Sequence, residues 1–223
     1  MAKPRRVDGI GAPVKRREDF RLLTGRGRYA EDWSTPEQVH AAFVRSPHAH
    51  ADVVAIDAKP ARGVEGVLGV FTGRDLVADG VGPIPTLIAE RGGGIRSRDG
   101  SAFAEPPWFP LATDTVRHAG EPVAIVVAAT PAAARDAADA VRVRYAERPS
   151  VVDAVAALAD GAPRLHAGVA DNRAYDWECG DADATARAIA SAAHVTRLTL
   201  VDNRLITCFL EPRARFAASW WTL

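Results

Sequence analysis

The most constraining feature of this sequence is an apolar run of strand length that leads directly into a helix start. Residues 123–128 are all apolar, and four of the six are β-branched, which predicts a buried strand. Thr130 suits the N-cap position because its hydroxyl can accept a backbone N–H, and Pro131 suits the first helical position, where no donor is needed. The sequence therefore predicts a strand and a helix that form one packed unit.

The predicted helix carries a narrow face of small residues. At positions i, i+3, i+4 and i+7 of this face lie Ala134, Ala137, Ala138 and Val141. Small side chains allow a helix to lie close against a sheet, so this face is expected to contact the strand before it. Residues 141–145 then alternate between apolar and polar side chains, which predicts a second strand.

Further elements are predicted upstream of this unit. Short apolar segments predict three more strands, at residues 39–45, 51–57 and 66–71. The first two are joined by a short segment in which Pro47 favours a turn. Residues 60–62 predict a helical turn, and Thr72 is a favourable cap for the segment after the third strand. Glycine and proline dominate residues 79–107, so regular structure is not expected there.

The last third of the chain predicts a second group of elements. An Ala-rich helix is expected within residues 150–163, beginning near Asp153. Alternating or apolar segments predict strands at residues 172–180, 194–201 and 208–220. Residues 181–193 predict a helix with acidic residues at its N-terminal end, where the helix dipole favours negative charge. The helix within residues 150–163 is the expected domain boundary.

Charge and hydropathy exclude several classes of protein. The 28 Lys and Arg residues balance 28 Asp and Glu residues, so no global field attracts nucleic acid or an anionic membrane. No apolar run approaches the roughly 20 residues that a membrane-spanning helix requires. The basic start of the chain is not followed by the apolar segment of a secretory signal. We therefore expect a cytoplasmic protein without nucleic-acid or membrane partners.

The chain has two cysteines, Cys179 and Cys208. They are too few for a disulfide framework and too far apart for a CxxC motif. Free, partly buried thiols in a reducing cytoplasm are expected. Two cysteines also cannot hold an iron–sulfur cluster alone, because such clusters usually need four ligands.

Three short motifs allow a ligand-binding interpretation besides a structural one. His48 and His50 form a His-x-His pair that could ligate zinc, but the local sequence supplies no further ligand, which favours a solvent-facing or hydrogen-bonded turn. Gly25 and Gly27 lack the preceding strand and third glycine of a dinucleotide motif, which favours a turn with positive φ. Residues 91–98 could cradle an anion with backbone N–H groups, yet without a phosphate-loop ending they favour a flexible surface loop.

Three separated motifs, taken together, resemble a known family. They are residues 17–29, 42–50 and 120–131. In this order they resemble the amino-terminal α/β hammerhead domain of the molybdenum hydroxylases, which include xanthine dehydrogenase, aldehyde oxidase and the large chain of aerobic carbon monoxide dehydrogenase. Residues 195–200 and 210–214 resemble the opening of the first molybdopterin-binding domain of that family.

The resemblance implies an α+β fold class and a division of the chain. A flexible arm is expected at residues 1–15, and an α/β hammerhead domain, a mixed sheet with helices, at residues 16–149. A linker with a helix would follow at residues 150–170. An incomplete α/β molybdopterin-binding domain would occupy residues 171–223. Because the sequence ends soon after the 210–214 motif, we expect a fragment, a truncated reading frame or a split subunit.

An incomplete second domain would leave an apolar sheet edge without the partners that cover it. The residues expected at this edge are Phe209, Leu210, Phe216, Trp220 and Trp221. Two positions differ from the usual family pattern. His118 stands where an aromatic residue commonly precedes the Gly-Glu-Pro segment, and Leu210 stands where methionine precedes Glu-Pro-Arg.

The function implied by the resemblance is that of a component of a molybdopterin-dependent oxidoreductase. In the family, a molybdenum atom held by pterin dithiolene hydroxylates an aldehyde, N-heterocycle or purine, or oxidises carbon monoxide. Electrons then pass through iron–sulfur clusters to FAD, often on separate subunits. The cofactor, in the cytosine dinucleotide form, is expected only in the complete enzyme and not in this chain alone. The expected partners are the rest of the molybdopterin subunit, an iron–sulfur subunit and an FAD subunit.

Four charged residues are candidates for a role near a cofactor. Glu211 lies at a predicted strand start and favours a structural ion pair. Asp114, Arg117 and Glu121 could face a cofactor domain, but turn and edge charges are the favoured interpretation. In the family, the substrate-positioning residues and the glutamate base lie downstream of the Glu-Pro-Arg motif. We therefore assign no catalytic and no metal-binding residue to this chain and leave its cofactor-binding residues open.

Two other functions compete with a part of a molybdenum hydroxylase. The chain could be a non-catalytic assembly domain that docks electron-transfer subunits without a cofactor of its own. A nucleotide-binding enzyme is a more distant alternative, because the glycine motifs lack their structural context. Molybdenum and pterin contents distinguish the first two, and a nucleotide titration tests the third.

Overall fold

The fold was analysed in a computed structural model that describes residues 10, 12, 14–29, 32–90, 94, 96–169 and 171–202. The chain divides into two compact units, of which one comprises Val39–Thr196 and the other comprises the segments before and after it. We call Val39–Thr196 the sheet unit. Helices and antiparallel strands occur together in the sheet unit, which confirms the α+β class.

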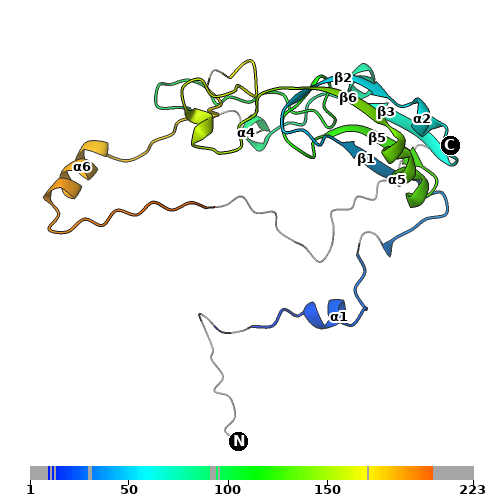
Figure 1. The fold of residues 1–223 in the computed structure, drawn as a ribbon. Helices are drawn as coiled ribbons and strands as arrows, with labels where there is room; N and C mark the ends of the chain where they lie inside the picture. The colour runs from blue at the N-terminus through cyan, green and yellow to red at the C-terminus, as the bar shows by residue number, and fades with distance from the viewer. Residues whose placement is uncertain are drawn as a thin grey trace, which may run out of the picture. The chain divides into compact units, whose positions relative to one another are not determined.

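The predicted buried strand lies at the centre of a three-stranded sheet (Figure 1). This strand, β5 (Pro122–Ala128), pairs antiparallel with β1 (His40–Arg45) on one side and β3 (Val67–Thr72) on the other. A central strand has sheet neighbours on both edges and packing on its faces, which explains its nearly continuous apolar sequence. The prediction of strand 123–128 is confirmed.

A second three-stranded sheet contains β2 (Ala51–Asp57) between β4 (Thr115–Val116) and β6 (Arg142–Glu147). All its pairs are antiparallel. The strands predicted at 39–45 and 51–57 therefore exist, but they belong to different sheets and do not pair with each other. The pairing of the described strands is also wholly antiparallel, not that of a mixed sheet.

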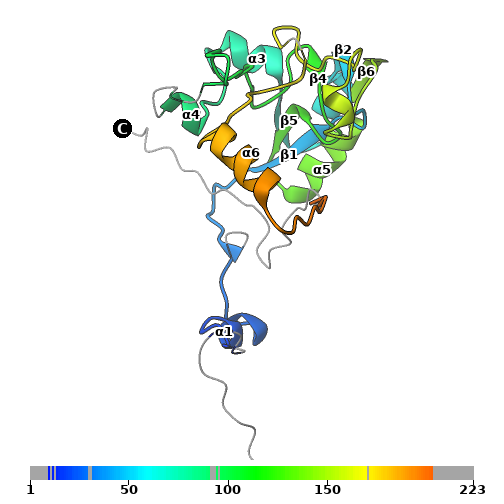
Figure 2. The ribbon, with the colours of Figure 1, turned by 90° about the vertical axis from the view of Figure 1, so that its left-hand side faces the viewer.

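One face of the first sheet is covered by two helices, α2 (Lys59–Arg62) and α5 (Pro131–Ala140) (Figure 1), and Figure 2 shows α5 beside β1 and β5. Helix α5 packs on β1 and β5, while α2 packs on β3 and α5. The predicted small-residue face is confirmed, because Ala134 and Ala137, which belong to α5, are fully buried. The apolar cluster under these helices comprises Ala58, Ala61, Val70, Val126, Ala137 and Val141.

The start of α5 is capped as predicted. The Ala133 N–H donates to the Thr130 hydroxyl over 3.1 Å, and Pro131 occupies the first turn. We expect Thr130→Ala to lower the free energy of unfolding by about 1 kcal/mol, because one backbone donor loses its partner. Urea unfolding of the full chain measures the loss, and Thr130→Ser, which keeps the hydroxyl, should show little of it. An equal loss in both variants would contradict a capping role.

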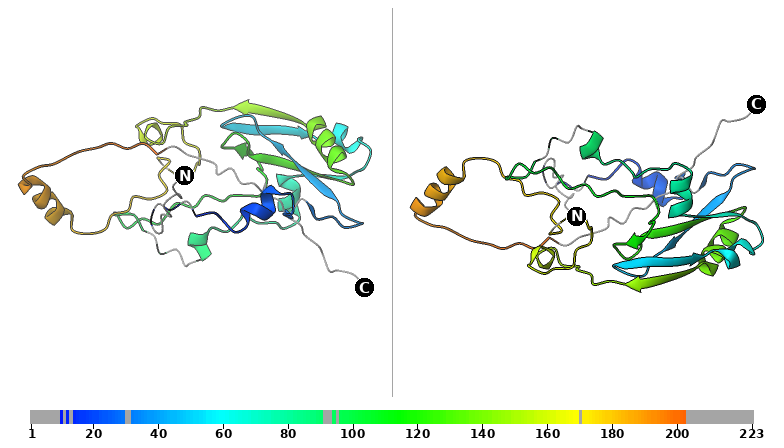
Figure 3. Two further views of the ribbon diagram at one scale, coloured as in Figure 1. Left: turned by 90° about the horizontal axis from the view of Figure 1, so that it is seen from below. Right: turned by 90° about the horizontal axis from the view of Figure 1, so that it is seen from above.

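The two sheets share a second apolar cluster. It consists of Ala51, Val53, Ala112, Val116 and Val123. Val44, Ile56 and Val143 contact both this cluster and the one beneath the helices, so they connect the two layers. Figure 3 shows the two sheets and α5 from opposite sides. The strands at the sheet centres thus carry the core, and the loops at their ends are free to form a site.

Helix α3 (Gly73–Ala78) follows β3 and begins with a complete capping box. The Asp75 N–H donates to the Thr72 hydroxyl, and the Thr72 N–H donates to the Asp75 carboxylate over 2.7 Å. Hydrogen bonds from Thr72 hold the pKa of Asp75 below its ordinary value. The predicted capping role of Thr72 is confirmed, and Gly73 is placed at the first helical position.

Other predictions were met in part outside the two sheets. The short helix α1 (Asp19–Leu23) precedes Gly25, whose φ of 70° confirms the expected turn. Helix α6 (Ala182–Ser191) is capped by Asp181 and confirms the helix predicted at 181–193. The described residues within 79–107 are largely irregular as expected, apart from the short helix α4 (Leu87–Glu90).

Three predicted elements are absent from the described part of the chain. The helix expected in 150–163 is reduced to the 3-10 turn η2 (Ala156–Leu158). Residues 172–180 form no strand, because Asn172 has a φ of 58° and its side chain bonds three backbone groups across the loop. Residues 194–201 form no strand within the described residues, since no described segment pairs with them. Residues 172–180 do bond to the segment at 98–104, through Arg98 to the Asp176 carbonyl and Ala104 to the Ala174 carbonyl, but these bonds do not form a regular ladder.

Several predictions lie outside the described residues. These are most of the arm at 1–15, half of the loop at 91–98, and the strand at 208–220 with Cys208, Glu211 and the apolar residues around them. Among the helices that the structure does describe, none is both long and apolar enough to cross a bilayer.

Candidate functional site

Two sequence motifs that are far apart along the chain meet at one end of the first sheet. The Gly120 N–H donates to the Ser46 carbonyl over 2.7 Å, and the Ser46 N–H donates to the Glu121 carbonyl over 2.9 Å. The Arg45 guanidinium donates to the Gly120 carbonyl over 2.8 Å. Gly120 has a φ of 88°, which favours glycine. The segment after β1 and the turn before β5 therefore form one rigid junction.

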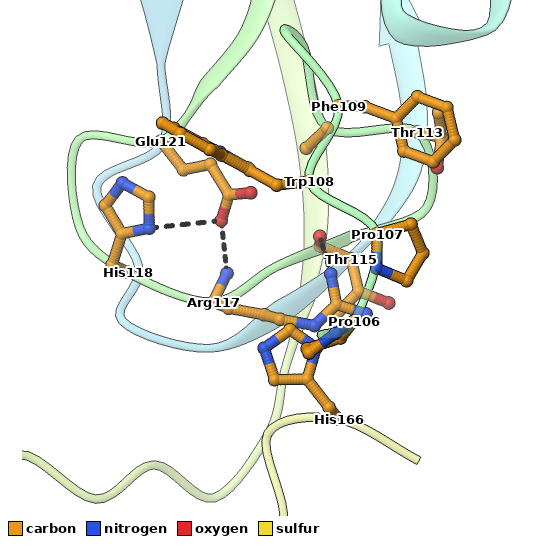
Figure 4. Close-up of a pocket in the computed structure, with 11 residues that line it drawn as sticks. Pro106, Pro107, Trp108, Phe109, Thr113, Thr115, Arg117, His118, Glu121 and His166 are labelled. Atoms are coloured by element: carbon orange, nitrogen blue, oxygen red, sulfur yellow. Dashed lines mark hydrogen bonds and ion pairs between the residues drawn. The ribbon is translucent and has the colours of Figure 1, made fainter. Parts of the chain in front are cut away.

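A pocket of about 190 Å³ lies beside this junction (Figure 4). Its wall comes from the segment before β4, the turn between β4 and β5, and one residue of a later loop. The lining residues are Pro106, Pro107, Trp108, Phe109, Ala112, Thr113, Thr115, Arg117, His118, Glu121 and His166. The pocket is mixed in character, with aromatic and proline rings on one part and four titratable side chains on another.

Glu121 is the buried charge of this pocket. The residue is only 7% exposed, and its Oε2 atom accepts the Arg117 backbone N–H over 2.5 Å. His118 Nδ1 lies 3.5 Å from the same oxygen. Glu121 therefore lies at a turn, as the favoured interpretation had it, but its side chain is buried. Its carboxylate closes the turn between β4 and β5, and a carboxylate loses its hydration when a backbone donor replaces water.

Arg117 also has a structural role that the sequence did not show, because its guanidinium bonds two backbone carbonyls. Its Nε donates to the Leu165 carbonyl over 2.9 Å, and its Nη1 donates to the Thr115 carbonyl over 3.1 Å. No ion pair between Arg117 and Glu121 occurs among the described residues. The guanidinium therefore holds the loop that carries His166 against the pocket.

His166 lies at the floor of the pocket in Figure 4, beside the Arg117 guanidinium. Burial lowers the pKa of His166, and the positive charge of Arg117 lowers it further, as does His50, while Glu121 opposes the shift. The folded chain therefore favours the neutral imidazole. A neutral imidazole adds no net charge to the pocket. It can both donate and accept a hydrogen bond.

The lowered pKa of His166 predicts a dependence of stability on pH. The unfolded chain has a histidine pKa of about 6.5, so the stability from neutral His166 is complete above that pH. It is lost as the pH falls through the lower pKa of the folded chain, because the imidazole must then be protonated in place. We expect His166→Gln to reduce this acid-side loss by less than about 1 kcal/mol, since the side chain is only partly buried.

Urea unfolding at several pH values between neutral and mildly acidic conditions measures this difference. The exposed His118 provides the control. His118→Gln should not change the loss of unfolding free energy at acidic pH that His166 causes. A pH dependence that is identical in the parent chain and in His166→Gln would contradict the assignment.

Asp114 does not belong to the pocket. Its carboxylate accepts the Arg74 guanidinium over 2.9 Å, and its side chain is 72% exposed. The interpretation of Asp114 as an edge charge is confirmed. An exposed pair of this kind contributes little to stability.

The His-x-His pair is divided between two environments. His50 is 5% exposed, and its Nδ1–H donates to the Pro149 carbonyl over 2.7 Å, which leaves Nε2 buried without a partner among the described residues. His48 packs on the Tyr145 ring and lies 3.5 Å from Glu147. In the described part of the chain no three His, Cys, Asp or Glu side chains form a possible metal site. The hydrogen-bonded turn is confirmed, and the zinc interpretation has no support there.

Two further sequence predictions are revised by the structure. Cys179 is exposed, not partly buried, because the strand expected around it does not form. Arg98, at the end of the possible anion cradle, already pairs with Asp176 and Glu178, at 2.6 and 3.0 Å. These carboxylates raise the pKa of Arg98. This arginine is therefore committed to neighbouring acids, and the central residues of the cradle lie outside the described ones.

Sequence reasoning missed Trp108 and His166 as members of the site. Trp108 directly follows the segment at 79–107, where irregular structure was expected, and it is 58% exposed at the pocket. A tryptophan between prolines is a signal that could have been used. His166 gave no signal, because a bond between distant residues, from Arg117 to the Leu165 carbonyl, holds its loop at the pocket.

Comparison with known proteins gives a consistent result. Residues 24–149 match the model of the family described as aldehyde oxidase and xanthine dehydrogenase, α/β hammerhead domain. The chain is 36% identical over 216 residues to the nicotine 6-hydroxylase large subunit of Paenarthrobacter nicotinovorans, covering 96% of this chain and 24% of that protein. It is 31% identical over 218 residues to the carbon monoxide dehydrogenase large chain of Afipia carboxidovorans, covering 92% and 25%.

The structure of the Cu,Mo-CO dehydrogenase in its carbon monoxide reduced state is similar to this fold. The TM-score is 0.64 at 31% identity, over 85% of this chain and 23% of that one. The chain thus spans about a quarter of the length of the curated relatives that it matches.

Proposed function

Since the chain belongs to the aldehyde oxidase and xanthine dehydrogenase family through its α/β hammerhead domain, we propose that it forms the amino-terminal part of a molybdenum hydroxylase large subunit. In this role it is a component of an oxidoreductase and is not catalytic alone. The reaction of the complete enzyme would be the oxidative hydroxylation of an aldehyde, N-heterocycle or purine, or the oxidation of carbon monoxide.

One observation carries this proposal. The similarity to the nicotine 6-hydroxylase large subunit extends over 96% of this chain, so it includes the residues on both sides of the hammerhead match. The likeness to the Cu,Mo-CO dehydrogenase supports the same conclusion at the level of the fold. The first relative is named as a large subunit, and the second is named as a dehydrogenase with copper and molybdenum.

The pocket beside Glu121 does not fit the pterin cofactor itself. The pocket of about 190 Å³ is smaller than the roughly 300–1,000 Å³ usual for small-molecule sites. Glu121 also faces it with a carboxylate, which repels the phosphate of a pterin nucleotide. We therefore derive no catalytic step from these side chains and propose that this part of the chain serves as a scaffold.

The proposal includes the partners that the complete enzyme requires. These are the remainder of the molybdopterin subunit, an iron–sulfur subunit and an FAD subunit. The molybdenum would be carried as a molybdopterin cytosine dinucleotide by the remainder of the subunit, and the assembly would be cytoplasmic. We further propose the domain limits inferred from the sequence, with the hammerhead domain at residues 16–149.

Purification from the source cells tests the proposal. The protein is tagged at its locus, isolated under mild conditions and assayed for molybdenum, pterin, iron and flavin. We expect all four to be recovered with it, and neither molybdenum nor pterin to be recovered with the 223-residue chain expressed alone. Recovery of a complex without molybdenum and pterin would contradict the proposal.

A non-catalytic assembly domain remains the alternative. The observation that favours it is the poor fit between the described pocket and a pterin. It predicts partner subunits but no molybdenum in any preparation. The metal assay therefore separates the two functions in a single experiment.

A further inference from the structure

We propose that Glu121 and Trp108 form a docking site for one cationic side chain, an ammonium or guanidinium group, that a partner polypeptide inserts into the pocket. Recognition of the cation follows from the geometry of the described residues. The source of the cation in a partner chain rests on the proposed function, in which this chain is one part of a larger assembly.

The first argument is an unused oxygen on a buried carboxylate. Among the described residues, both contacts of the Glu121 carboxylate, from the Arg117 N–H and from His118, reach Oε2. Figure 4 shows the other oxygen pointing toward the middle of the lining residues, and no described residue donates to it. This oxygen is not one of the buried polar atoms that lack a partner, so it is open to the pocket although the residue as a whole is only 7% exposed. The pocket thus presents a carboxylate acceptor that an entering donor can reach.

The second argument is the charge balance around that oxygen. Arg117 directs Nε and Nη1 at the Leu165 and Thr115 carbonyls, and it makes no ion pair with Glu121 among the described residues. Burial and Arg117 lower the pKa of His166, so its imidazole is neutral at neutral pH. His118 is the one ion-pair partner of Glu121 among the described residues, and it is 60% exposed at a separation of 3.5 Å. Arg117 also lines the pocket and keeps its positive charge, so the preference for a cation depends on direct contact with the Glu121 carboxylate and not on the net charge of the pocket.

The third argument concerns size and shape. A volume of about 190 Å³ accommodates the end of one long side chain but not a cofactor. Trp108 lines the same pocket and is 58% exposed, so an indole face is available. Ammonium and guanidinium groups bind favourably over an indole ring, and they are also the strongest donors to a carboxylate. A carboxylate and a tryptophan in one small pocket are thus suited to Lys or Arg.

The test uses the 223-residue chain, methylguanidinium chloride as the probe and the backbone amide N–H resonances as the readout in every variant, with the indole N–H resonance of Trp108 as a second readout in the chains that keep this residue. The indole resonance is identified by its loss in Trp108→Phe. We expect a saturable shift with a millimolar dissociation constant at fixed ionic strength. Glu121→Gln keeps the shape and should weaken binding about tenfold, because a charge-assisted bond is lost. Trp108→Leu should weaken it about threefold.

Asp114→Asn is the matched control, because it removes an exposed carboxylate outside the pocket, and it should leave the affinity unchanged. Since Glu121→Gln also alters a turn, Trp108→Leu keeps the test decisive if that variant unfolds. Three results would overturn the proposal: an unchanged affinity in a folded Glu121→Gln, an equal affinity in Trp108→Leu, or binding of acetate as tight as that of methylguanidinium. An absent saturable shift in the parent chain would overturn it as well.

The source of the cation is tested in the assembly isolated from the source cells. Methylguanidinium should not bind there, because a partner side chain already occupies the pocket, and Glu121→Gln should lower recovery of the partner several-fold. Binding of the probe to the intact assembly would overturn the partner assignment and point to a free amine as the ligand. If no assembly is recovered, the proposed function fails, while the titration of the chain alone still decides whether the pocket binds cations.

Discussion

Replacing Gly73 by alanine is expected to lower the free energy of unfolding by about 3 kcal/mol. A Cβ at this position would lie 2.5 Å from the Ala112 carbonyl oxygen and 2.7 Å from the Leu111 carbonyl oxygen. Both are backbone atoms next to a buried segment, so they cannot move aside as the end of a flexible side chain can. Urea or thermal unfolding of the full chain measures the loss.

The matched control for this prediction is Gly82→Ala. A Cβ at Gly82 would meet nothing within 4 Å, and its φ is not in the left-handed region. This variant should therefore unfold within about 0.5 kcal/mol of the parent. Equal losses at Gly73 and Gly82 would show that the close approach at Gly73 is not what limits substitution there.

The Gly73 variant also connects the fold to the pocket. The strand-to-helix corner at Gly73 packs directly on residues 111–112, and the same segment continues into Ala112 and Thr113 of the pocket wall. Displacing those carbonyls moves one wall relative to Glu121. Any Gly73→Ala chain that still folds should therefore bind methylguanidinium more weakly than the Gly82→Ala control.

Replacing Ala137 by leucine is expected to lower the free energy of unfolding by about 2–3 kcal/mol. Ala137 is completely buried between α5 and the first sheet and belongs to the core cluster that includes Val126. Three additional heavy atoms would force the helix away from β1 and β5, on which it packs. Unfolding of the full chain by urea, followed by circular dichroism, measures the effect.

The same helix supplies a control at Ala132, which is exposed. Leucine there has almost the helix propensity of alanine and meets no buried wall, so Ala132→Leu should change stability by less than about 0.5 kcal/mol. A loss at Ala132 as large as at Ala137 would indicate a general effect on α5 and would contradict close packing against the sheet.

Local sequence patterns determined most of the elements in the sheet unit. The apolar run at 123–128 became a central strand, Thr130 became a cap, and the small-residue face of α5 became the contact with the sheet. These features depend on neighbours only a few residues away, such as the periodicity of side chains and the fit of a hydroxyl to a free N–H. The helices and strands of this unit were therefore largely predictable.

The failed predictions depend on contacts that local sequence does not show. The helix in 150–163 and the strands at 172–180 and 194–201 were inferred from composition and alternation, yet none of them forms in the described residues. Short helices and single strands are unstable without a surface to pack on or a strand to pair with. Local sequence cannot show whether such a partner is present.

The assignment of strands to sheets was decided only by the tertiary structure. Residues 39–45 and 51–57 read as neighbours, but the chain crosses at Ser46 from one sheet to the other because Ser46 bonds the Gly120–Glu121 backbone. Pairing between strands depends on backbone groups, which are nearly the same in every residue. No local pattern of side chains therefore specifies which strand is the neighbour.

By itself, the sequence determined that this chain has an α+β hammerhead fold and belongs to the molybdenum hydroxylase family, because those features are carried by contiguous motifs. Only the tertiary structure decided that Glu121 is buried, that Arg117 points away from it, and that His166 completes the pocket. The reason is that burial and charge balance arise from side chains that long-range contacts bring together. Their spacing along the chain carries no record of those contacts.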